Sequence, residues 1–283
     1  MKAAGDWLAY TGTDYAPAHD QMGWAHLHSY SARFGVWGEG APLVLVPGLA
    51  GGMRLLGPLI RALAKDHQVI SFQPRGEDDA FAMRRRFSLT DLVDDLAEFL
   101  DWMGLEQPAV LGVSFGGVLA LELAMRQPWR LRALALQGVG PRLAPGLLQR
   151  IAGMVLARYP LPPDSPFFNQ FFKLFFGGKQ PEGPLFDFVT RTCWGTDQGV
   201  MAHRFRLMEQ ADFEGRLGAM PVPTLLMSGA RDLLVTPHGL AGMADELPDA
   251  RAVHLGQAGH LACVTHPDRL ATETRSFLRS LED

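Results

Sequence analysis

The stretch GVSFGG, residues 112–117, decides how the rest of this sequence is interpreted. It joins a short apolar run, AVLGV, to a helical pattern, VLALELAMRQ. A sharp turn from strand to helix holds Ser114 in a strained conformation, raises its hydroxyl clear of the sheet and aims the next amide the same way. Gly112 and Gly116 let the strand and the helix approach closely. The turn therefore predicts that Ser114 is a nucleophile.

Length and composition limit the classes of function. With 283 residues, 47% of them hydrophobic and 20% charged, the chain has the composition of an ordinary soluble enzyme. A net charge of −4 without a long run of one sign argues against nucleic-acid binding, and we interpret MRRRF (83–87) as a solvated face. The sequence shows neither a signal peptide nor an apolar run of about 18 residues, so we expect a cytoplasmic protein without a membrane span.

The sequence offers little for a metal or redox site. Cys193 and Cys263 cannot form a disulfide framework and neither belongs to a CxxC pair, so we expect quiet thiols in or near the core. His26 and His28 would share one face if their stretch were a strand, but a third ligand is not evident. We therefore expect no metal and no cofactor.

Short apolar runs that fit buried strands recur along the chain. They lie at residues 43–46, 69–72, 109–113, 133–136, 224–227 and 252–255. Helical patterns separate most of them. The clearest is 88–103, where Ser88 fits an N-cap with Asp91 at the reciprocal position. This alternation predicts an α/β fold, in which helices cover both faces of a mostly parallel sheet and function lies beyond the carboxyl ends of the strands.

The alternation is interrupted between residues 141 and 215. There, Pro-rich turns and an aromatic block, FFNQFFKLFF, replace the strand–helix rhythm. We interpret this segment as a mainly helical cap, inserted into a core formed by residues 1–140 and 216–283.

A serine hydroxyl is nearly inert at neutral pH, so Ser114 needs a base and a group that orients the base. His260 follows the last predicted strand, and free histidine has a pKa of about 6.5, suited to taking and returning a proton. His254 and His266 are poorer candidates, because one lies within its strand and the other opens the last helix. Asp232 follows the preceding strand, whereas the loop QGVG after the fourth strand has no acid. Asp232 is therefore the expected orienting carboxylate.

Acyl transfer also needs donors for the negative oxygen of its transition state. One is the amide of Phe115, next to the nucleophile. The other should come from the glycine-rich loop PGLAGG, residues 47–52, after the first parallel strand. Pro47 has no amide hydrogen, so Leu49 is the better donor.

The ordered motifs resemble the α/β-hydrolase superfamily over nearly the whole chain, through RFGVWGEGAPLVLVPG, QPRG, GVSFGG, SGARD and AGH. The resemblance implies a catalytic triad and two oxyanion-hole donors, formed by Ser114, Asp232 and His260 and by Leu49 and Phe115. The set is specific for the superfamily and unspecific for the reaction. Capped serine members include carboxylesterases, lactonases, carbon–carbon bond hydrolases, cofactor-free perhydrolases and acyltransferases. The serine also argues against the epoxide hydrolase and haloalkane dehalogenase branches, which use a carboxylate there.

Two departures from the family pattern affect the predicted site. Most relatives have His-Gly where this chain has Pro47-Gly48. This leaves open how the loop of residues 47–52, which we call the oxyanion loop, is braced. They also commonly have Asp-x-Arg-Gly-x-Gly where this chain has QPRGED, residues 73–78. We expect Arg75 to remain structural.

The aromatic block predicts an apolar pocket. Its phenylalanines recur as pairs four apart, which would give a helix one broad apolar face; they are Phe167, Phe168, Phe171, Phe172, Phe175 and Phe176. They either close over an acyl or aromatic group or pack the cap onto the core or a partner subunit, and packing is the more usual role. No cation is evidently aimed at the site. The expected substrate contacts are Phe171, Phe172, Phe175, Val235 and Leu261.

Together these features predict a serine hydrolase that cleaves carboxylic esters of apolar acyl or aromatic groups through an acyl-enzyme. A carbon–carbon bond hydrolase, a perhydrolase or an acyltransferase could use the same triad, and a non-hydrolytic small-molecule receptor could retain it. The expected partner is a small neutral ester, and a homodimer is left open.

Overall fold

The computed structural model describes residues 21–77, 86–143, 147–159, 161, 165–177 and 183–282. Within these ranges, the side chains of residues 147–152, 166–168 and 171 are not described. Most of the MRRRF cluster lies outside the described residues, so its interpretation as a solvated face stays a prediction.

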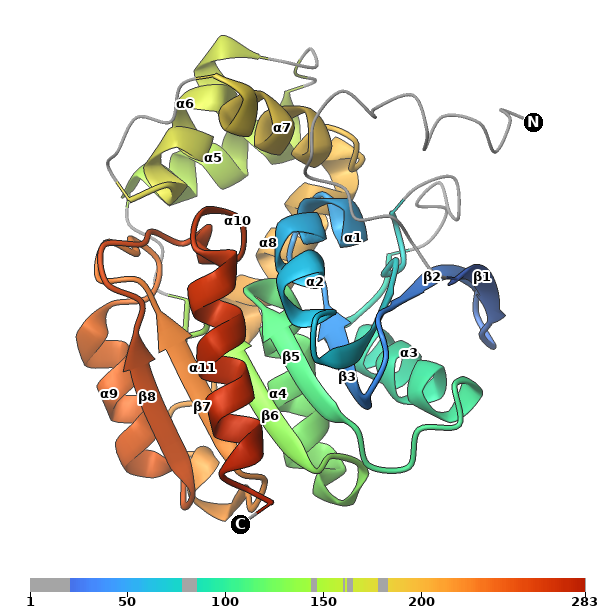
Figure 1. The fold of residues 1–283 in the computed structure, drawn as a ribbon. Coiled ribbons are helices and arrows are strands. Elements are labelled where there is room, and N and C mark those ends of the chain that lie inside the picture. Colours follow the sequence, from blue (N-terminus) through green and yellow to red (C-terminus); the bar gives the residue numbers. More distant parts are fainter. Residues whose placement is uncertain are drawn as a thin grey trace.

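An eight-stranded sheet runs through the centre of the molecule (Figure 1). Its strands are β1 Gln21–His26, β2 Ser31–Trp37, β3 Ala41–Val46, β4 His67–Phe72, β5 Ala109–Val113, β6 Ala133–Gln137, β7 Thr224–Ser228 and β8 Ala250–His254. Their order is β1-β2-β4-β3-β5-β6-β7-β8. Strands β3 to β8 are parallel, whereas β1 and β2 are antiparallel. The six predicted strands are confirmed, and β1 and β2 escaped prediction because their sequences lack a continuous apolar run.

Successive side chains of the parallel strands point to opposite faces of the sheet, and both faces are buried. In β3, Val44 and Val46 enter one apolar layer, and Leu43 and Leu45 enter the other. This two-sided burial explains why the strands read as unbroken apolar runs.

Helices cover both faces, as predicted (Figure 1). The first face is covered by α3 Leu89–Trp102, α4 Phe115–Arg126 and α9 Pro237–Glu246; the second is covered by α1 Gly52–Leu55, α2 Gly57–Leu63, α10 Ala262–Thr265 and α11 Pro267–Arg279. Helix α3 begins with the predicted capping box. The Ser88 amide donates to Asp91 Oδ2 at 2.6 Å, and the Asp91 amide donates to Ser88 Oγ at 3.1 Å.

In the part of the chain that the structure describes, four more α-helices lie between β6 and β7. They are α5 Leu147–Arg158, α6 Pro166–Phe175, α7 Pro184–Cys193 and α8 Gln198–Gln210. The two ends of this insertion meet, because the Phe213 amide donates to the Pro141 carbonyl at 2.8 Å and Arg142 bridges to Asp212. Its helical content agrees with the expected cap, while the division of the chain into core and cap stays a prediction. No helix in the described ranges is long and apolar enough to cross a membrane.

The turn from β5 to α4 has the strained geometry that the sequence predicted. Ser114 has φ 51° and ψ −117°, and is the one described residue other than glycine with a positive φ. A Cβ on Gly112 would lie 2.4 Å from Gly117 Cα, and one on Gly116 would lie 2.3 Å from the carbonyl oxygen of Pro47. Because backbone atoms cannot give way cheaply, only glycine fits at positions 112 and 116.

The first prediction concerns this close approach. Gly116→Ala should lower the free energy of unfolding by about 3 kcal/mol, because the added methyl group would overlap two backbone carbonyls. The control is Gly242→Ala in α9, where nothing lies within 4 Å of an added Cβ. This control should stabilise the protein by about 0.5–1 kcal/mol. Urea unfolding followed by circular dichroism compares the variants, and equal stability of the two would contradict the packing.

Candidate active site

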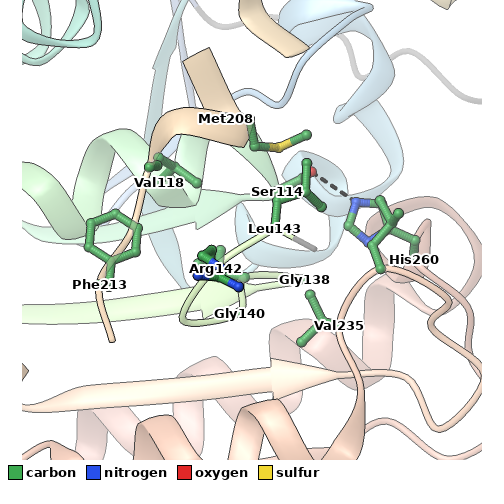
Figure 2. A pocket seen from close by; sticks show the side chains of 13 residues that line it. Ser114, Val118, Gly138, Gly140, Arg142, Leu143, Met208, Phe213, Val235 and His260 are labelled. Carbon is green, nitrogen blue, oxygen red and sulfur yellow. Dashed lines mark hydrogen bonds between the residues drawn. The ribbon is translucent and has the colours of Figure 1, made fainter. Parts of the chain in front are cut away.

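Three side chains from separate loops meet at the carboxyl edge of the sheet. Ser114 follows β5, Asp232 follows β7 and His260 follows β8. Ser114 Oγ lies 2.8 Å from His260 Nε2, and His260 Nδ1 lies 2.9 Å from Asp232 Oδ2. Figure 2 shows the Ser114 hydroxyl and the His260 ring pointing toward each other. Asp232 and His260 are 6% and 8% exposed. The structure therefore brings the three predicted residues into one buried series of contacts.

Asp232 controls which nitrogen of His260 carries the proton. Asp232 Oδ1 accepts from the amides of Leu234 at 2.8 Å and Val235 at 3.1 Å, which leaves Oδ2 for the imidazole. Burial alone would raise the pKa of Asp232, but the charge and hydrogen bond of His260 and these two amides outweigh it and hold that pKa below its ordinary value. An ionised Asp232 accepts the hydrogen on Nδ1, so Nε2 is free to accept from the Ser114 hydroxyl.

Neighbouring elements position the loop that carries His260. Gln137 Nε2 donates to the His260 carbonyl at 2.9 Å, and the Leu261 amide donates to the Phe175 carbonyl at 3.0 Å. An added Cβ on Gly138 would lie 2.9 Å from His260 Cε1. Gln137 was not among the predicted site residues, although it is a lone polar residue directly after the apolar run of β6.

The segments with the two predicted oxyanion donors flank Ser114. An added Cβ on Gly48 would lie 3.7 Å from Ser114 Cβ, and Leu49 lines the same cavity as Ser114. Phe115 is the first residue of α4, where a helix provides no internal acceptor for the amide. The donor roles of Leu49 and Phe115 stay predictions.

The loop after β4 is structural, as expected for Arg75. Arg75 Nε and Nη2 donate to the two carboxylate oxygens of Asp95 at 2.9 and 2.6 Å. Gln73 Oε1 accepts from the amide of Met53 at 3.0 Å. This loop therefore joins the sheet to α3 and to the end of the oxyanion loop.

An apolar cavity of about 150 Å³ lies beside Ser114. Among the expected substrate contacts, Phe172, Phe175 and Leu261 line it, and the side chain of Phe171 lies outside the described residues. Apart from His260, the other large side chains in the lining are apolar, namely Leu49, Leu55, Leu56, Leu156, Leu174, Met201, Phe205, Met208, Leu233 and Leu234. No Lys, Arg, Asp or Glu is among the described lining residues. The cavity therefore suits an apolar group.

Val235 lies elsewhere. It lines a separate, smaller recess of about 20 Å³ that also touches Ser114 and His260, together with Gly138 and Arg142 (Figure 2). The expected substrate contacts are therefore divided between two spaces, both of which are lined by Ser114 and His260.

The rings of the aromatic block take different positions, and whether they close over a substrate group or pack the cap onto the core stays a prediction. Phe172 and Phe175 line the cavity, and the Phe175 ring lies 5.8 Å from the His260 ring. Phe176 instead packs against Phe186 of α7, with ring centroids 6.1 Å apart. Phe175, the last residue of α6, and Phe176, its C-cap, thus make different contacts because their side chains point in different directions from the end of the helix.

The histidines near the N-terminal hairpin do not share a strand face. Strand β1 ends at His26, whose Nδ1 lies 2.9 Å from Ser31 Oγ, and His28 lies in the turn that follows. The condition under which the two histidines would share a strand face is therefore not met. Groups of three or more His, Cys, Asp or Glu that could hold a metal ion are not found in the part of the chain that the structure describes.

Comparison with known proteins places the chain in a family. Residues 41–267 match the family described as alpha/beta hydrolase fold. The chain is 29% identical to "Putative carbamate hydrolase RutD" of Azorhizobium caulinodans, over 87% of this chain and 94% of that protein. It is 26% identical to the poly(3-hydroxyalkanoate) depolymerase of Ectopseudomonas oleovorans, over 84% of each chain.

A solved structure shows the same fold. The enol-lactonase of Burkholderia xenovorans LB400 matches with a TM-score of 0.80 and 21% identity, over 91% of this chain and 100% of that one. The chain belongs to the α/β-hydrolase family and is a hydrolase of that superfamily.

The second prediction concerns Cys193 and Cys263, which are free, buried and part of the cavity lining. Burial raises the pKa of Cys263 to about 12 and raises the pKa of Cys193 as well. At about pH 8 both should remain protonated in the native protein, whereas unfolding returns their pKa values to about 8.5. Iodoacetamide should therefore label the native protein at least about 100-fold more slowly than the urea-unfolded protein. Peptide mass spectrometry measures the labelling rate of each cysteine. Fast labelling of either thiol in the native protein would contradict its burial in the protonated form.

Proposed function

We propose that the protein hydrolyses neutral carboxylic esters with an apolar acyl or aromatic group through an acyl-enzyme on Ser114. The observation that supports this most directly is the series of contacts from Asp232 through His260 to Ser114, at 2.9 and 2.8 Å, beside an apolar cavity. A hydroxyl, a base and an orienting carboxylate in this order are the components of nucleophilic acyl transfer.

In the first half-reaction, Ser114 Oγ attacks the ester carbonyl carbon while His260 Nε2 accepts the hydroxyl proton. Asp232 accepts a hydrogen bond from Nδ1–H and stabilises the imidazolium without taking the proton. The amides of Leu49 and Phe115 donate to the oxyanion. When the tetrahedral intermediate collapses, its bond to the alcohol oxygen breaks and the alcohol takes the proton from His260.

In the second half-reaction, water attacks the carbonyl carbon of the acyl-enzyme. His260 accepts a proton from the water and returns it to Ser114 Oγ as the acid leaves. No step needs a redox partner, since the carbonyl carbon has the same oxidation state in the ester, the acyl-enzyme and the acid.

The lining of the cavity favours a neutral, apolar substrate. Every methylene that enters such a cavity gains about 0.8 kcal/mol of transfer free energy. A charged group would lose its hydration without finding an ionic partner among the described lining residues. The name of the Ectopseudomonas relative also points to ester chemistry, because a poly(3-hydroxyalkanoate) is joined by ester bonds.

The third prediction uses p-nitrophenyl esters from acetate to laurate. kcat/KM should rise about fourfold for each methylene that the cavity buries and should fall again once the chain is longer than the cavity. Ser114→Ala should abolish turnover, and Ser276→Ala on the surface helix α11 is the matched control that should keep it. Ester turnover that survives Ser114→Ala would refute the nucleophile. Product analysis with alcohol and thiol acceptors would separate hydrolysis from acyl transfer.

The fourth prediction concerns Asp232→Asn. An asparagine amide can donate to Nδ1 and so favour the histidine tautomer with hydrogen on Nε2, which cannot accept from Ser114. kcat should fall about 10⁴-fold with an unchanged circular dichroism spectrum. Asp268→Asn is the control, because Asp268 is exposed and pairs with Lys65 at the surface. Full activity of Asp232→Asn would remove Asp232 from the proposed triad.

A further inference from the structure

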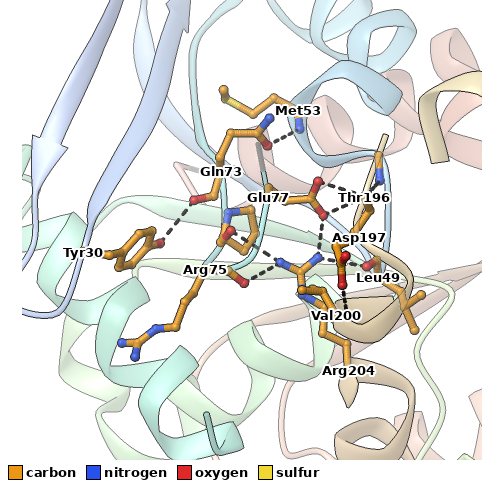
Figure 3. A network of polar contacts seen from close by, with 12 residues as sticks. Tyr30, Leu49, Met53, Gln73, Arg75, Glu77, Thr196, Asp197, Val200 and Arg204 are labelled. Carbon is orange, nitrogen blue, oxygen red and sulfur yellow. Dashed lines mark hydrogen bonds and ion pairs between the residues drawn. The ribbon is translucent and has the colours of Figure 1, made fainter. Parts of the chain in front are cut away.

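A buried polar network reaches the oxyanion loop from two directions (Figure 3). Arg204 of α8 and Glu77 of the loop after β4 are 0% and 3% exposed, and Arg204 Nη1 donates to Glu77 Oε1 at 2.6 Å. Thr196, in the turn before α8, donates its hydroxyl hydrogen to Glu77 Oε2 at 2.9 Å. The centre of the network is therefore a buried ion pair with a hydroxyl attached to it.

The network ends on the backbone of residues 47–52. Arg204 Nη1 donates to the Leu49 carbonyl at 2.9 Å, and the Gly51 amide donates to Thr196 Oγ1 at 2.8 Å. Arg204 Nη2 also donates to the Arg75 carbonyl at 2.8 Å. One guanidinium group thus ties the oxyanion loop to the loop after β4, and one hydroxyl group ties it to the inserted helices.

The oxyanion loop needs such external restraint. Gly51 and Gly52 have φ of 81° and 48°, and glycine in an unrestrained loop has more conformational freedom than any other residue. Pro47 restricts the loop only at its start. An oxyanion donor is effective only when its hydrogen is already aimed at the developing charge, so fixing the Leu49 carbonyl and the Gly51 amide also limits where the Leu49 amide can point.

Stability alone is a poor reason for this network. The desolvation of a buried ion pair offsets most of its attraction, and apolar residues of the same volume often serve stability as well or better. Arg204 Nε, moreover, is buried without an acceptor in the described part of the molecule. Arg204 Nη1 and Thr196 Oγ1 both reach the oxyanion loop as well as Glu77, which indicates a role in the geometry of the loop.

We propose that Arg204, Glu77 and Thr196 are positioning residues that hold the Leu49 amide in place for the oxyanion. This inference rests on the proposed function, in which Ser114 attacks an ester. The three residues touch neither the reacting atoms nor the substrate, and act through the backbone of the loop. They couple the inserted helices to the rate of the chemical step.

The test compares Glu77→Gln and Thr196→Val with a matched control, Asp95→Asn. Asp95 is buried, forms an ion pair with the part-buried Arg75, and in the described structure has no hydrogen bond to the oxyanion loop. With p-nitrophenyl hexanoate, the two network variants should lower kcat about tenfold with KM within about twofold, because the lost interaction acts in the transition state. Asp95→Asn should lower the thermal stability and leave kcat unchanged.

A binding measurement separates positioning from general damage. Hexyl trifluoromethyl ketone can form a tetrahedral oxyanion with a serine, whereas hexyl methyl ketone has the same chain and adds far less readily. The network variants should lose affinity for the trifluoromethyl ketone by the same factor as kcat and keep their affinity for the methyl ketone. Arg204→Lys, which retains a charged donor, should keep more kcat than Arg204→Met.

The outcomes distinguish this inference from the proposed function. Wild-type turnover that depends on Ser114, combined with unchanged kcat in Glu77→Gln and Thr196→Val, would overturn the positioning role alone. Equal loss of kcat in Asp95→Asn would also overturn it. A wild type that neither hydrolyses esters nor binds the trifluoromethyl ketone would overturn both. If it binds the ketone without ester turnover, the proposed function fails and the relative ketone affinities still decide the positioning role.

Discussion

The backbone strain at Ser114 is the constraint on which the rest of the structure depends. A positive φ at a non-glycine residue costs about 1–3 kcal/mol and persists only where its surroundings enforce it. Here the Ser114 amide donates to the Gln137 carbonyl of β6 at 2.8 Å, and α4 starts at the next residue. Because the turn is so tight, the neighbouring backbone segments approach it to distances that only glycine allows. These close backbone contacts hold β3, β5, β6 and α4 in fixed positions relative to the Ser114 oxygen.

The same strand ends that enforce the strain also deliver the partners of Ser114. Gln137 holds the serine amide through its carbonyl and the His260 carbonyl through its side chain. Gly138, the next residue, lies against the His260 ring. The end of β6 therefore contacts both Ser114 and His260 and sets the distance between them. This is possible because the carboxyl ends of parallel strands lie along one edge of the sheet.

The inserted helices do more than cover the sheet. Helix α6 provides apolar rings to the cavity and a carbonyl that anchors the His260 loop, while α8 sends Arg204 to the oxyanion loop. Two arginine–carboxylate pairs, each with a buried carboxylate, differ in this respect. Arg75 and Asp95 join a loop to α3, whereas Arg204 and Glu77 reach the backbone beside Ser114. The same kind of ion pair thus joins a loop to a helix in one place and contacts the backbone beside Ser114 in another.

The sequence by itself determined the sheet from β3 to β8, the capping box of α3, the turn at Ser114 and the order of Ser114, Asp232 and His260. These features are local, since periodicity, capping residues and glycines at a turn act over a few neighbouring residues. Only the tertiary structure decided that Phe175 lines the cavity while Phe176 packs on α7, and that Val235 belongs to a separate recess. It also decided how the oxyanion loop is braced, which the Pro47-Gly48 sequence had left open. Arg204 is 155 residues from Leu49 in the chain, and contacts over such separations depend on how whole elements pack, which no local pattern specifies.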